Sequence, residues 1–179
     1  MKCYLTKNCK KLFFTFLFFV SIANVNSQNR DYTLYIFLLD NCKISQSYSL
    51  KINELYKEYN DIVDFVGVFP NRISTEDNIE AHMQKYKHEF SFITDYDKEL
   101  ALSLNATITP EVFLLENKTD EILYSGRIDN EFVQVGRRRN VVTEEELSVA
   151  LKSIREGNEI KIKSTEAIGC FINFFDTQN

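Results

Sequence analysis

Cys42 is the residue of this chain with the clearest capacity for chemistry. It follows an apolar run at residues 34–39 and the polar pair Asp40-Asn41, and a helix-like pattern begins immediately after it. The start of a helix offers unpaired backbone N–H groups and the positive end of the helix dipole, which favour a thiolate, and Lys43 acts in the same direction. Such a thiolate is a nucleophile near neutral pH. The sequence therefore predicts a reactive Cys42, with a buried structural thiol as the alternative.

A second thiol is needed for complete disulfide chemistry, and it is not found beside Cys42. The position three residues further on is Ser45, which could donate a hydrogen bond to a thiolate but cannot resolve a mixed disulfide. Resolution would require Cys170, glutathione or a cysteine of a partner protein. Because sequence separation does not give spatial distance, two interpretations of Cys170 stay open: a resolving or structural pair with Cys42, and a small buried hydrophobe in an extra strand.

The first 27 residues have the composition of a secretory signal peptide. Four lysines and no acidic residue precede a short apolar core at residues 12–23, and Ala23 and Ser27 are plausible cleavage points. The core is shorter than the ~20 residues that a spanning helix needs, and an uncleaved anchor is the alternative. We therefore expect export to the periplasm or the extracellular space, with no stable membrane insertion after cleavage.

Charge and composition restrict the partners of the remaining chain. Residues 28–179 carry 17 basic against 26 acidic side chains, a net charge of −9. This balance argues against nucleic acid and anionic membrane surfaces as partners. Cys3 and Cys9 lie in the expected signal peptide, which leaves two cysteines in a compartment where disulfides persist. No His or Cys pair has metal-ligand spacing, and the sequence indicates no metal or cofactor.

The order of expected elements indicates a mixed α/β sheet. Buried strands at 34–39 and 62–70 alternate with helical patterns at 44–59 and 75–86, followed by a short strand at 90–95 and a short helix at 98–106. Two strand-like runs, 111–116 and 121–128, flank the turn-forming "NKTD" and predict a hairpin. An amphipathic helix over 143–157, with Thr143 and Glu146 as a capping box, closes the domain.

Three segments of this pattern resemble the thioredoxin superfamily, and more narrowly its redoxin branch of alkyl hydroperoxide reductase/thiol-specific antioxidant-like proteins. They are the strand–"DNC"–helix opening, "ATITPEVFLLE" and "ILYSGRIDN". The resemblance implies a three-layer thioredoxin-like fold, with a central mixed sheet flanked by helices, over residues 28–157. Residues 158–179 then form an extension that carries Cys170. It also implies that Thr109 precedes a cis Pro110, and that this pair faces Cys42 across the site; Asn41 and Ser45 complete the expected substrate-facing residues.

The departures from the family pattern shape the functional hypothesis. Cys42-Lys43-Ile44-Ser45 replaces the Cys-x-x-Cys pair, and the threonine and proline that precede a peroxidatic cysteine are absent. A dedicated peroxidase is therefore disfavoured. We expect an exported thiol–disulfide oxidoreductase acting on protein or small-molecule thiols and disulfides, with Cys42 as nucleophile. The alternative is a redox-inactive module of the same fold that binds a protein partner.

Overall fold

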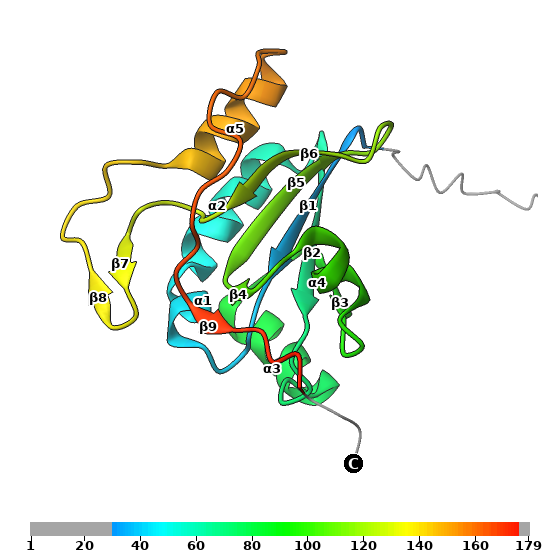
Figure 1. Cartoon of the computed structure of the whole chain (residues 1–179), viewed down its shortest axis with the longest axis vertical. Helices are drawn as coiled ribbons and strands as arrows, with labels where there is room; N and C mark the ends of the chain where they lie inside the picture. The colour runs from blue at the N-terminus through cyan, green and yellow to red at the C-terminus, as the bar shows by residue number, and fades with distance from the viewer. Residues whose placement is uncertain (1–29, 176–179) are drawn as a thin grey trace, which may run out of the picture.

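A five-stranded mixed sheet forms the centre of the computed structural model, which describes residues 30–175 (Figure 1). The strand order is β3-β2-β1-β5-β6, with bounds β1 (Tyr32–Phe37), β2 (Val63–Phe69), β3 (Ser91–Thr94), β5 (Glu111–Glu116) and β6 (Glu121–Gly126). β1, β2 and β3 run parallel, whereas β5 is antiparallel to both β1 and β6. The predicted α/β class with a central mixed sheet is confirmed: the alternating half of the sequence supplies the parallel strands and the hairpin supplies the antiparallel pair.

Helices cover both faces of this sheet. They are α1 (Lys43–Ser47), α2 (Ser49–Tyr59), α3 (Glu76–Tyr86), α4 (Glu99–Leu104) and α5 (Glu146–Arg155). The larger apolar cluster joins the sheet to α2, α3 and α5, and the smaller one joins it to α4. Leu34 and Ile36 of β1 belong to the larger cluster and Phe37 to the smaller. β1 is therefore buried on both faces, which explains its continuous apolar sequence.

The helix predicted over 44–59 is divided in two at Tyr48. The Tyr48 hydroxyl donates a hydrogen bond to the Asp129 carboxylate at 2.7 Å, and the ring packs against Phe132 with centroids 5.6 Å apart. The side chain thus fixes the junction of α1 and α2 against the loop that follows β6.

The capping box predicted for the last helix is wrong. α5 begins at Glu146, with Glu145 as N-cap, and not at Thr143. The backbone N–H of Thr143 donates to the side-chain oxygen of Asn130, and its hydroxyl accepts from the Asn130 amide. Asn130 therefore occupies both groups that a helix cap would have used.

The chain after α5 returns across the domain as a segment that we call the C-terminal arm, residues 163–173. Ser164 forms a parallel bridge with Ser125 of β6, and β9 (Cys170–Phe171) then pairs antiparallel with β4 (Ile108–Thr109). Figure 1 shows the arm, in red, running down beside the β6 side of the sheet, past α1 and towards α3. A small hairpin of β7 (Phe132–Gln134) and β8 (Arg137–Arg138) projects beside it.

The predicted signal peptide, residues 1–27, lies outside the residues that the structure describes. Within residues 30–175, no helix has the length and apolar character needed to cross a membrane.

Candidate functional site

Cys42 lies at the corner where β1 leads into α1. Its N–H donates to the Leu39 carbonyl at 3.0 Å, which closes the turn, and its own carbonyl accepts from the N–H of Gln46 at 2.9 Å. Cys42 is the N-cap residue of α1, a helix of five residues. The residue is only 2% exposed. The corner therefore holds the thiol inside the protein and not on its surface.

The loop that enters β5 lies directly against this thiol. The Thr109–Pro110 peptide bond is cis, and the Cys42 Sγ donates to the Thr109 carbonyl at 3.6 Å. Thr109 is fully buried and Pro110 is buried as well. The structure thus brings together Cys42 and the Thr-Pro pair from segments that are 67 residues apart in the sequence.

Cys170 is delivered to the same place by the C-terminal arm. In the β4–β9 pair Thr109 lies opposite Cys170, and the Thr109 hydroxyl donates to the Cys170 carbonyl at 3.2 Å. The Cys170 thiol is a neighbour of the Cys42 side chain, and both cysteines are free thiols. Burial, reinforced by this contact with Cys42, raises the pKa of Cys170 to about 12. In this arrangement Cys170 is therefore a protonated thiol at neutral pH.

Asn41 and Ser45, the remaining expected site residues, lie in different environments. Asn41 is exposed at the corner before Cys42. Ser45 is 1% exposed, and its hydroxyl oxygen accepts from the N–H of Leu39 at 3.4 Å. Ser45 therefore supports the end of β1 from within the protein, whereas Asn41 is available to a molecule that approaches from solvent.

Two carboxylates support the site, Asp129 buried and Glu111 half-buried, and no sequence motif marked either role. Glu111 accepts hydrogen bonds from the backbone N–H groups of Thr107, at 2.9 Å, and Ile108, at 3.3 Å. Asp129 accepts from the Tyr48 hydroxyl and from the N–H of Glu131. Burial raises the pKa of both carboxyl groups. The first carboxylate shapes the proline loop, and the second fixes the α1–α2 junction.

The arm is fastened by a buried asparagine and an apolar anchor. Asn71, 4% exposed, donates from its amide to the Phe171 carbonyl at 3.2 Å and accepts from the N–H of Asn173 at 2.7 Å. Ile172 is buried in the smaller apolar cluster, and its N–H donates to the Thr107 carbonyl at 2.9 Å. Sequence reasoning missed Asn71, because nothing in its local sequence marks a partner 100 residues away.

Gly169 is required for the close approach of the arm to β4. A Cβ placed on Gly169 would lie 2.0 Å from the Thr109 carbonyl oxygen and 2.6 Å from its carbon, which are backbone atoms with no freedom to rotate away. The Gly-Cys pair near the C-terminus was visible in the sequence, but its steric role depends on pairing with β4.

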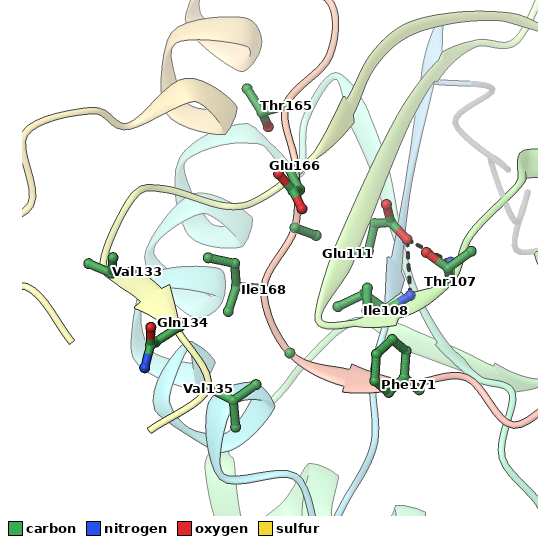
Figure 2. Close-up of a pocket in the computed structure, with 12 residues that line it drawn as sticks. Thr107, Ile108, Glu111, Val133, Gln134, Val135, Thr165, Glu166, Ile168 and Phe171 are labelled. Carbon is green, nitrogen blue, oxygen red and sulfur yellow. Dashed lines mark hydrogen bonds between the residues drawn. The ribbon is translucent and has the colours of Figure 1, made fainter. Parts of the chain in front are cut away.

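A cavity of about 590 Å³ opens on the outer side of the arm (Figure 2). Figure 2 shows Val133 and Val135 on one side of it and Ile108 and Phe171 on the other. The charged side chains in its lining are the carboxylates of Glu111 and Glu166, and neither Cys42 nor Cys170 belongs to the lining. The arm therefore separates this cavity from the thiol pair.

No family model matches this sequence, and no curated protein matches it. Solved structures do match. An uncharacterized conserved protein from Geobacillus kaustophilus aligns with a TM-score of 0.70 and 22% identity, over 83% of this chain and 79% of its own. A candidate thioredoxin from Neisseria meningitidis aligns with a TM-score of 0.52 and 19% identity, over 70% and 73%.

A secreted disulfide oxidoreductase of Mycobacterium tuberculosis, described as homologous to DsbE of E. coli, aligns with a TM-score of 0.51 and 15% identity, over 69% of this chain and 81% of its own. Identities at this level establish architecture. The chain has a thioredoxin-like fold, as its sheet order and its cis-proline loop beside a strand-to-helix cysteine also indicate.

Proposed function

We propose that this protein is a thiol–disulfide oxidoreductase whose redox pair is Cys42 and Cys170. The observation that carries the proposal is that both cysteines meet at Thr109: the Cys42 Sγ donates to the Thr109 carbonyl at 3.6 Å, and Cys170 lies opposite Thr109 in the β4–β9 pair. The sulfurs of a dithiol pair must meet before they can form a disulfide. The likeness in fold to a secreted disulfide oxidoreductase supports this assignment.

Cys42 and Cys170 together can reduce a partner disulfide without a third thiol of this protein. The Cys42 thiolate attacks one sulfur of a partner disulfide, the partner S–S bond breaks, and the departing partner thiolate takes the proton of Cys170. Cys170, now a thiolate, attacks the Cys42 Sγ, which expels the second partner sulfur as a thiolate and leaves a Cys42–Cys170 disulfide; the expelled thiolate takes up the proton that Cys42 had released to solvent. Two electrons pass to the partner. Asn41 is exposed to the partner, whereas Thr109 and Pro110 would meet it only after the buried site opens.

The test is a redox titration of the full chain with Cys3→Ser and Cys9→Ser, so that two thiols remain. The protein is equilibrated in glutathione buffers of graded potential, its free thiols are trapped, and the peptides are mapped without reduction. We expect a Cys42–Cys170 disulfide to appear in a single two-electron transition. Insulin reduction should fall to background in Cys42→Ser and in Cys170→Ser. Two thiols that stay free in every buffer, with insulin reduction unaffected by either substitution, contradict the proposal.

The burial of Cys42 favours a second candidate, a redox-inactive module that binds a protein partner. A thiol that is 2% exposed reacts slowly with anything that cannot displace its cover. This candidate predicts no disulfide in the titration and no insulin reduction, so the same experiment separates the two.

We further propose that the protein acts after export, with residues 1–27 removed as a signal peptide. The basic start and the short apolar core support this. A disulfide between Cys42 and Cys170 would persist in the oxidising compartment that export reaches. N-terminal sequencing of secreted protein should begin after Ala23 or Ser27, and an intact Met1 would contradict it.

A further inference from the structure

The C-terminal arm occupies the surface through which Cys42 would be reached. Cys42 and Thr109 are 2% and 0% exposed, and β9 lies along β4 directly beside them. A partner that forms a mixed disulfide with Cys42 must therefore bind where the arm now lies. The arm lies near the end of the chain and is joined to α5 through the exposed residues Lys161 and Ile162.

The contacts of the arm define what this place accepts. Residue 169 has no room for a Cβ, residue 170 pairs with Thr109 beside Cys42, and residue 172 inserts an apolar side chain into the smaller cluster. Phe171 is 79% exposed, so its side chain is not selected. Asn71 hydrogen-bonds two backbone groups of the arm, the Phe171 carbonyl and the Asn173 N–H. The accepted pattern is an extended segment Gly-Cys-x-apolar.

We propose that the β4 edge and Asn71 form a binding site for an extended segment of a partner polypeptide with the pattern Gly-Cys-x-apolar, and that the C-terminal arm is its resident occupant. This deepens the proposed function by naming the kind of polypeptide that the Cys42 site takes. Strand addition supplies the backbone hydrogen bonds, and the glycine and apolar positions supply the selectivity. The partner segment gains access to Cys42 only by displacing the arm.

The first measurement tests whether the arm covers Cys42. In a full chain with Cys3, Cys9 and Cys170 replaced by serine, Cys42 is the remaining thiol, and its alkylation by iodoacetamide is followed over time. Gly169→Ala should undock the arm and accelerate alkylation by about tenfold or more, the ratio that corresponds to ~1.4 kcal/mol. Lys161→Ala, an exposed change beside the arm, is the matched control and should leave the rate unchanged.

The second measurement tests the binding site itself. The probe is a fluorescent peptide with the sequence of residues 165–174 and serine in place of Cys170, compared with the same peptide carrying alanine in place of Gly169. In the Gly169→Ala chain, with Cys42 also replaced by serine, the glycine peptide should bind about tenfold tighter than the alanine peptide. It should also bind this chain more tightly than the matched chain that retains Gly169, because the resident arm competes there.

Ile172→Glu provides a second way to release the arm, because it places a charge where an apolar side chain is buried. Both variants are checked by circular dichroism. Unchanged alkylation in Gly169→Ala and Ile172→Glu, or equal binding of the two peptides, overturns the proposal. No Cys42–Cys170 disulfide can form in these proteins and peptides, so a failed redox titration and a failed binding experiment are distinguishable.

Discussion

Removing the Asn71 side chain should loosen the C-terminal arm without unfolding the domain. Asn71 makes two hydrogen bonds to the arm backbone, and it is almost completely buried. At ~0.5–1.5 kcal/mol for each bond, Asn71→Ala should shift arm opening by ~1–3 kcal/mol, or about 5- to 150-fold in the opening constant. The reporter is the Ile172 N–H, which donates to the Thr107 carbonyl and exchanges with solvent when the arm opens.

The assay is amide hydrogen exchange resolved at single residues. We expect exchange of the Ile172 N–H to accelerate by this factor, while the Leu38 N–H, which donates to Val68 within the sheet, exchanges as in the unmodified protein. Asn53→Ala is the matched control: Asn53 also makes two side-chain hydrogen bonds, to the Tyr86 carbonyl and to His88, on a helix away from the arm. Equal Ile172 exchange in the two variants would refute the reasoning.

Two further predictions test other parts of the structure. Gly126 has φ +125°, and an added Cβ would lie 2.1 Å from the Thr165 carbonyl oxygen; Gly136, with φ +80°, has open space around it. Gly126→Ala should lower the free energy of unfolding by ~3 kcal/mol and Gly136→Ala by ~1 kcal/mol in urea titrations, and equal losses would contradict this steric account. Burial, together with His82, lowers the pKa of His88 to about 4, so the unfolded chain binds the proton first as the pH falls. Stability should therefore drop by about 2 kcal/mol between pH 7 and pH 5, and His88→Gln should remove most of this drop; an unchanged pH dependence in that variant would exclude His88 as its source.

Local patterns predicted the sheet and the strand-to-helix corner that carries Cys42. The continuous apolar run of β1 follows from burial on both faces, and the hairpin of β5 and β6 follows from the turn-forming residues between them. These elements depend on neighbours in the sequence, so periodicity and turn chemistry determine them. The strand-to-helix corner was placed correctly for the same reason.

Long-range contacts account for what the sequence did not predict. Thr143 does not cap α5 as predicted, because its backbone N–H donates to the Asn130 side chain. The helix predicted over 44–59 is divided at Tyr48, whose hydroxyl donates to the Asp129 carboxylate. The contact of Cys42 with Cys170 depends on an arm that pairs with a two-residue strand, β4, which has no periodicity to detect. Weak alternation in residues 158–175 gave no reason to place one strand beside Thr109.

A disulfide between Cys42 and the C-terminal arm would also couple the redox state of the protein to its free energy of unfolding. A disulfide between Cys42 and Cys170 would close a ring of about 130 residues, enclosing nearly the whole domain, and in the chain-entropy description a ring of ~100 residues stabilises the folded state by ~4.7 kcal/mol. Thermodynamic linkage requires the folded protein to favour the disulfide by the same amount relative to the unfolded chain. For a two-electron couple this corresponds to a reduction potential about 100 mV lower in the folded state. Folding would thus make the oxidised arm harder to release, and an electron donor would have to be correspondingly more reducing.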